Sequence, residues 1–186
     1  LIGGEHLVTL PAFRALQAKY PDVAVIHFDA HTDLREEYLG NRLSHATVIR
    51  RIWELIGDGR IFQFGIRSGE RAEWYWSAEG HTKIQKFSFA GLDETIAALK
   101  GRPVYLTIDL DVLDPSCFPG TGTPEAGGVR FTDLLSAALR TIRGCYIVGC
   151  DMVELSPPLD PSGTSTATAL KLLREMLLAL EKPYLK

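Results

Sequence analysis

Short apolar runs that read as strands alternate along the chain with segments of helical periodicity, and this alternation constrains the fold most. The strand-like runs cover residues 23–28, 61–66, 104–108 and 146–150, with a weaker one at 83–89. Helical patterns lie before, between and after them, at residues 9–19, 44–56, 68–79, 92–100, 132–143 and 166–181. Parallel strands need long crossover connections, which helices of this length supply. The pattern predicts one α/β domain with a mainly parallel sheet covered by helices on both faces, a three-layer α/β/α architecture.

Residues with strong preferences for helix ends mark several of these boundaries. Thr9 is expected as the N-cap of the first helix, with Pro11 in its first turn. Ser68 is expected as the N-cap of the third helix. Gly101 and Gly144 follow two later helices and are typical of helix C-termini.

Acidic residues directly follow the strand-like runs. Asp29, His31 and Asp33 lie in the run DAHTD after residues 23–28, and Asp109 and Asp111 lie in DLD after residues 104–108. Residues two apart in an extended chain point to the same side, and open parallel sheets bind ligands at the carboxyl ends of their strands. The two runs therefore predict a pair of cations that share bridging oxygens and activate water, as in a metallohydrolase.

His6 adds a second imidazole to this set, which then offers four carboxylates and no thiolate. Such an oxygen-dominated set favours Mn²⁺ or a similar divalent ion, with Fe²⁺, Co²⁺ and Zn²⁺ as alternatives. His27 precedes the DAHTD run on the same strand, and we expect it to point away from Asp29 and to be structural. A third acidic segment, at 151–154, follows the run at 146–150 and is expected at the same edge of the sheet.

Composition excludes several classes of partner. The net charge of the 186 residues is −3 and no basic run is present, which argues against nucleic acid or an anionic membrane as main partner. No apolar stretch is long enough to span a bilayer. Three cysteines without CxxC spacing are typical of a reducing compartment, so we expect a cytoplasmic protein. The chain opens on LIGGEH, where Gly-Gly is typical of a strand end, and we expect residues 1–186 to be the C-terminal portion of a longer chain with a single catalytic domain.

Three motifs resemble those of the ureohydrolase family, which comprises arginases, agmatinases and related hydrolases of guanidino compounds. They are GGEH at 3–6, DAHTD at 29–33 and DLDVLDPSCFPGTGTPEAGG at 109–128, in the family's order. The resemblance implies an arginase-type fold and a site for two Mn²⁺ ions per chain. It assigns His6, Asp29, Asp33 and Asp109 to one ion, and Asp29, His31, Asp109 and Asp111 to the other, so that Asp29 and Asp109 bridge.

Within the family, residues 29–51 and 61–74 are most similar to the agmatinase branch. Residues 34–37 do not resemble the polar residues with which arginases hold the α-amino and α-carboxylate groups. The resemblance therefore implies hydrolysis of agmatine to putrescine and urea. Glu36 and Glu37 either face the amine end of the substrate or are solvated surface acids. The rival functions are a guanidinobutyrase, an arginase with an atypical substrate loop, and a catalytically silent subunit.

The resemblance also implies roles for residues around the reacting carbon. It places Glu154 where the family binds the guanidinium, which a carboxylate pairs with in bidentate geometry. It implies that His45 shuttles a proton to the leaving amine and that Asp33 accepts a proton while it holds metal. Thr123 is expected either to line the pocket or to stabilise its turn. The resemblance favours a homo-oligomer, either a trimer or a hexamer.

Overall fold

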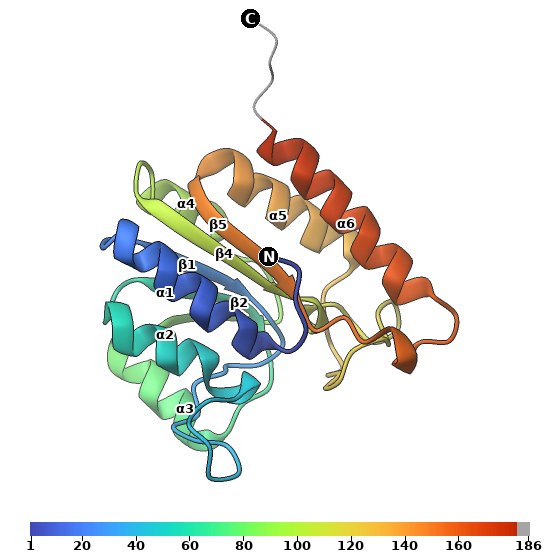
Figure 1. Cartoon of the computed structure of the whole chain (residues 1–186), viewed down its shortest axis with the longest axis horizontal. Coiled ribbons are helices and arrows are strands. Elements are labelled where there is room, and N and C mark those ends of the chain that lie inside the picture. Colours follow the sequence, from blue (N-terminus) through green and yellow to red (C-terminus); the bar gives the residue numbers. More distant parts are fainter. Residues whose placement is uncertain (182–186) are drawn as a thin grey trace, which may run out of the picture.

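A five-stranded parallel sheet forms the centre of the molecule in the computed structural model, which describes residues 1–181 (Figure 1). The strands are β1 (Ala24–Phe28), β2 (Ile61–Ile66), β3 (Lys83–Lys86), β4 (Pro103–Asp109) and β5 (Tyr146–Val153). Their order is β3-β2-β1-β4-β5, and every neighbouring pair is parallel. The predicted α/β class and the parallel sheet are confirmed.

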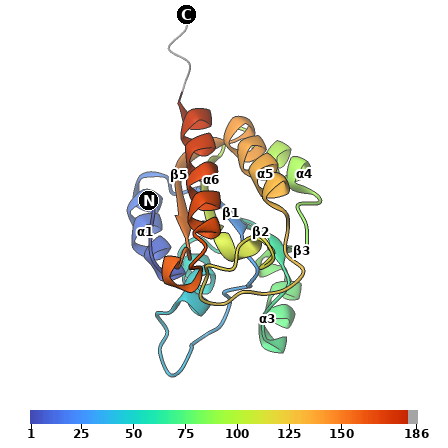
Figure 2. The same ribbon diagram turned by 90° about the vertical axis from the view of Figure 1, so that its right-hand side faces the viewer.

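Helices cover both faces of the sheet, as Figures 1 and 2 show. The α-helices are α1 (Thr9–Lys19), α2 (Val48–Ile56), α3 (Arg71–Trp76), α4 (Leu92–Ala98), α5 (Phe131–Gly144) and α6 (Thr164–Leu180). Short helical turns are η1 (His6–Val8), η2 (His45–Thr47), η3 (Ser77–His81), η4 (Leu110–Val112) and η5 (Pro157–Leu159). Among residues 1–181, no helix combines the length and the apolar character needed to cross a bilayer.

Two apolar clusters hold the layers together because alternate strand residues face opposite sides of the sheet. Ile26 and Phe28 of β1 pack in the cluster that α4, α5 and α6 cover. Val25 of β1 and Tyr105 of β4 pack in the cluster that α1 and α2 cover. His27 lies two residues after Val25 on β1, so its side chain faces the same side of the sheet, towards α1 and α2. Asp29, two residues after His27, shares that side.

Two predicted helix caps are wrong. Thr9 is the first residue of α1 rather than its N-cap, and its hydroxyl is buried. Helix α3 begins at Arg71 with Glu70 as N-cap, whereas the Ser68 hydroxyl donates to the Glu125 carboxylate 2.8 Å away. At Ser68 a tertiary contact that local sequence preference cannot anticipate engages the hydroxyl instead of the helix end.

Candidate metal centre

His6 reaches the carboxyl ends of the strands because the segment before it lies beside β5. Ile2 forms a parallel bridge with Met152, and the Gly3 N–H donates to the Met152 carbonyl over 3.2 Å. The turn η1 then begins at His6, with a Glu5 carboxylate oxygen accepting the Leu7 N–H at 3.0 Å. This path places the His6 imidazole over the edge of the sheet where β1 and β4 end.

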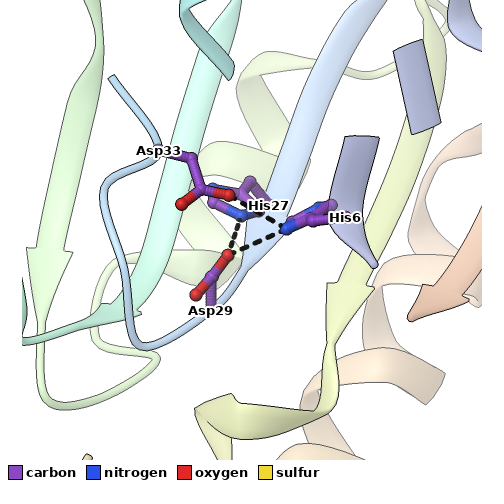
Figure 3. A group of neighbouring side chains, drawn as sticks. All are labelled: His6, His27, Asp29 and Asp33. Atoms are coloured by element: carbon purple, nitrogen blue, oxygen red, sulfur yellow. Dashed lines mark hydrogen bonds and ion pairs between the residues drawn. The ribbon is translucent and has the colours of Figure 1, made fainter. Parts of the chain in front are cut away.

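Three carboxylates surround one nitrogen of His6. His6 Nδ1 lies 3.1 Å from Asp29 Oδ2, 3.0 Å from Asp33 Oδ2 and 3.2 Å from Asp109 Oδ2 (Figure 3 shows the first two contacts). Two ligand atoms at right angles around an ion with bonds of about 2.1 Å lie about 3.0 Å apart. The three distances from His6 Nδ1 therefore match edges of a coordination shell around one divalent cation.

A second group of possible ligands shares Asp29 with the first. His31 Nδ1 lies 2.9 Å from Asp111 Oδ2 and 3.4 Å from Asp29 Oδ1. Asp29 thus presents one oxygen to each side. The ligand atoms of His6, Asp29 and Asp33, together with His27, are close enough to hold one metal ion, and those of Asp29, His31 and Asp111 are close enough to hold another. Asp109 Oδ1 instead accepts the Asp111 N–H at 2.9 Å, so bridging by Asp109 stays a prediction.

The protonation pattern of the cluster fits a site built for cations. Burial and the neighbouring Asp29 raise the pKa of Asp33 to about 7, and burial with its acidic neighbours also raises the pKa of Asp109 and Asp111. Burial would lower the pKa of His6, but its bonds to Asp109, Asp29 and Asp33 outweigh burial and raise it well above the usual value. Without metal, protons must therefore offset the crowded negative charge, whereas divalent cations can replace them.

His27 does not point away from Asp29, contrary to the prediction. Its Nε2 lies 2.7 Å from Asp29 Oδ2, and both side chains are fully buried (Figure 3). The physical reason is strand parity, since residues two apart on β1 share a face. His27 also meets the spacing for the first metal group, but both of its ring nitrogens are hydrogen-bonded, Nδ1 to Gln63 at 3.1 Å. It therefore orients the shared Asp29 carboxylate from outside the ligand set.

The residues that could bind metal are brought together by irregular loops that follow the strands, and not by the extended segments that the sequence predicted. Strand β1 ends at Phe28, and Asp33 has a φ of 53°, in the left-handed region. The buried Glu73 carboxylate of α3 fastens the loop around Asp33, accepting from the Thr32 hydroxyl at 2.6 Å and from the Leu34 N–H at 2.8 Å. Sequence reasoning missed Glu73 because nothing local links it to a loop 39 residues earlier.

Arg67 fastens the other ligand-bearing loop and was also missed. Its Nη2 donates to the carbonyls of Asp111 and Glu125, each at 2.8 Å, and its Nη1 donates to the carbonyl of Val112 at 3.2 Å. This guanidinium therefore ties the end of β2 to the chain that carries Asp111 and to the loop that carries Thr123. An arginine within a GIRSG run directly after a strand was the only signal available.

The cluster of His and Asp side chains opens into a cavity of about 440 Å³ whose lining includes the other predicted site residues Glu154, His45 and Thr123. Glu154 Oε1 accepts a hydrogen bond from the backbone N–H of His6 at 2.8 Å, and burial raises the pKa of the Glu154 carboxyl. The His45 ring lies 5.4 Å from the Tyr38 ring, which shares the lining. Thr123 Oγ1 is 3.4 Å from Asp111 Oδ2.

Glu36 and Glu37 are exposed, and neither is among the described residues that line this cavity. Glu36 instead pairs with surface arginines, at 3.5 Å from Arg50 and 3.7 Å from Arg42. Of the two alternatives for Glu36 and Glu37, the structure therefore supports the one in which they are solvated acids on the surface.

Comparison with known proteins gives the same assignment along nearly the whole chain. Residues 1–179 match the arginase family. The chain is 49% identical over 183 residues to the agmatinase of Bacillus subtilis (strain 168), with 97% of this chain and 63% of that protein covered. It is 37% identical to the guanidinobutyrase of Pseudomonas aeruginosa, covering 96% of this chain and 59% of the relative.

Solved structures share the fold as well as the sequence. A crystal structure of a Clostridium difficile protein assigned as an agmatinase superposes with a TM-score of 0.93 at 54% identity, covering 96% of this chain and 66% of that one. The chain spans about 63% of the length of the Bacillus agmatinase that it matches. A parallel sheet of this order, acidic loops at its carboxyl edge and a family match over residues 1–179 lead to one conclusion: the chain belongs to the arginase family of ureohydrolases.

Proposed function

We propose that this site hydrolyses the guanidinium group of agmatine to putrescine and urea with two Mn²⁺ ions, and that residues 1–186 belong to a single ureohydrolase catalytic domain. One observation carries the proposal: Asp29 offers an oxygen to each of two buried His and Asp groups. Agmatinases at 49% identity support the substrate. The ions would supply a water nucleophile at neutral pH and stabilise the charge that develops at the reacting carbon.

The ligand sets of the proposal are His6, Asp29, Asp33 and Asp109 for one ion, and Asp29, His31, Asp109 and Asp111 for the other. The first set is supported by His6 Nδ1, which is buried and lies 3.0–3.2 Å from oxygens of all three carboxylates. The second set is supported by the 2.9 Å approach of His31 Nδ1 to Asp111. Nitrogen and carboxylate oxygens without thiolate suit Mn²⁺.

Glu154 would hold the substrate guanidinium against this centre. Its Oε1 accepts the His6 N–H, which fixes the carboxylate beside a metal-facing residue and leaves lone pairs on both oxygens for the planar cation. His45 would protonate the leaving amine from the cavity wall, Asp33 would accept the proton of the nucleophile, and Thr123 would contact the substrate.

The charge of the cavity supports a dicationic substrate. Seven carboxylates line it against one arginine: Asp33, Glu70, Glu73, Asp109, Asp111, Glu125 and Glu154. The arginine, Arg35, is itself paired with Glu70 at 3.1 Å. Even four positive charges from two divalent ions would leave an excess of negative charge, which favours agmatine over substrates that carry a carboxylate.

The test is urea release from agmatine, arginine and 4-guanidinobutyrate after Mn²⁺ loading, with metal content determined on the same sample. Turnover of agmatine well above the other two supports the proposal. Preference for 4-guanidinobutyrate or arginine would replace the substrate and retain the metal site. Two bound ions without turnover of any of the three would indicate a silent subunit. We further propose a trimer or a hexamer, which light scattering tests on the same sample.

A further inference from the structure

A row of four buried polar side chains crosses the sheet directly below the metal-facing residues. Gln63 of β2, His27 of β1, Thr107 of β4 and Asp151 of β5 are successive register partners. None of the four is more than 1% exposed. Burying polar groups is costly unless they find partners, and all four side chains are hydrogen-bonded, although Gln63 Oε1 has no partner among the described residues.

The Asp151 end of the row determines which nitrogen of His6 carries a proton. The Asp151 carboxylate accepts from the Tyr105 hydroxyl at 2.7 Å and from the Thr107 hydroxyl at 2.6 Å. His6 Nε2 lies 2.9 Å from the same Thr107 oxygen. A hydroxyl has a single hydrogen, and Thr107 gives it to Asp151, so its oxygen must accept from His6 Nε2–H. In neutral His6, the form that binds metal, the Nδ1 lone pair then points towards the three carboxylates.

The Gln63 end determines the proton position on His27. Gln63 Nε2 donates to the Thr32 carbonyl at 2.8 Å, which fixes the orientation of the amide, and it lies 3.1 Å from His27 Nδ1. His27 Nδ1 therefore accepts a hydrogen bond, and its Nε2–H donates to Asp29 Oδ2 at 2.7 Å. The Asp29 carboxylate, which both groups share, thus accepts a hydrogen bond of fixed direction from His27.

We propose that the row Gln63–His27–Thr107–Asp151 is a positioning platform that holds the side chains of His6 and Asp29 in the orientation required to bind metal. The four residues touch neither substrate nor metal in this scheme and act through His6 and Asp29. Asp151 also lends negative charge to His6 through Thr107, which makes Nδ1 a stronger ligand. The inference rests on the proposed function, because it requires a metal ion at His6.

The test is Mn²⁺ affinity and stoichiometry, measured on the full chain by equilibrium dialysis with EPR detection of free Mn²⁺. Thr107→Val keeps the shape and removes the hydroxyl, and we expect one ion per chain to bind about 10–100-fold more weakly. Thr107→Ser restores the hydroxyl and should restore the affinity. Tyr105→Phe removes the other hydrogen bond to Asp151 and should leave both affinities unchanged, since Tyr105 is not on the path to His6.

Asp151→Asn provides a second variant if Thr107→Val does not fold. Its neutral amide removes the negative charge that Asp151 lends to His6 through Thr107, so it should also weaken one ion selectively. Selective loss of one ion in either variant, with rescue by Thr107→Ser, supports the platform. Wild-type binding of two ions with unchanged affinities in Thr107→Val and Asp151→Asn overturns the platform alone. Absence of Mn²⁺ binding by the wild type overturns the proposed function and the platform with it.

Discussion

Replacing Glu73 should loosen the loop that carries Asp33 and lower stability by an amount that the contacts allow us to work out. The carboxylate is 4% exposed and accepts three hydrogen bonds, at 2.6 Å from the Thr32 hydroxyl, 2.8 Å from the Leu34 N–H and 2.6 Å from the Glu70 N–H. Hydrogen bonds to a charged group contribute about 1.5–3 kcal/mol each and do not add fully. Glu73→Ala should therefore lower the free energy of unfolding by about 3–5 kcal/mol.

Glu73→Gln provides the sharper version of this experiment. Its Oε1 can still accept two of the bonds, but its amide N–H₂ then faces the Glu70 N–H, so we expect a loss of about 1–3 kcal/mol. Urea denaturation of the metal-free chain measures both losses. Glu94→Gln makes the same chemical change at an exposed position of α4 and should stay within about 0.5 kcal/mol of wild type. If Glu73→Gln is as mild as Glu94→Gln, Glu73 does not fasten the loop.

Three further predictions concern the loop after β4. Arg67→Lys cannot reach the same set of carbonyls, so KM for agmatine should rise more than kcat falls in steady-state assays; equal effects would contradict a role in shaping the cavity. Gly128→Ala should lower Tm by several degrees in calorimetry, because its Cβ would clash with the Asp114 backbone nitrogen, whereas Gly4→Ala meets open space. Hydrogen bonds from Ser116, Gly128 and Gly127 lower the pKa of Asp114 to about 2. Because this pKa is depressed, the stability that the ionised Asp114 contributes is complete above about pH 4 and is lost as the pH falls towards 2. A carbon NMR titration of the Asp114 carboxyl measures its pKa, and a midpoint near pH 4 would refute the prediction.

The sequence predicted the layers of the fold because strands and helices here follow hydrophobic periodicity. All five strand-like runs form parallel strands, and β4 ends at Asp109, directly at the DLD motif. Helix starts were less predictable. Ser68, for example, donates its hydroxyl hydrogen to Glu125, a residue 57 positions away, instead of capping a helix. Local preference cannot anticipate a partner at that separation.

For the site, the identity of the clustered residues was predictable, but the surroundings that orient them were not. Motif spacing grouped Asp29 with Asp33, and the family resemblance added His6. The structure places Asp29 Oδ2 and Asp33 Oδ2 within 3.1 Å of His6 Nδ1. The contact of His27 with Asp29 could have been found from strand parity alone. The alignment of Asp151 with Thr107 depends on the register of β4 against β5, which includes an irregularity that no sequence pattern reveals.

The most direct test of the two-ion centre is an anomalous difference map from crystals soaked in Mn²⁺ and measured at the manganese absorption edge. We expect two peaks about 3.5–4 Å apart, one bonded to His6 Nδ1 and the other to His31 Nδ1, with Asp29 between them. A single peak, or peaks away from Asp29, would contradict a centre in which one carboxylate is shared by two ions.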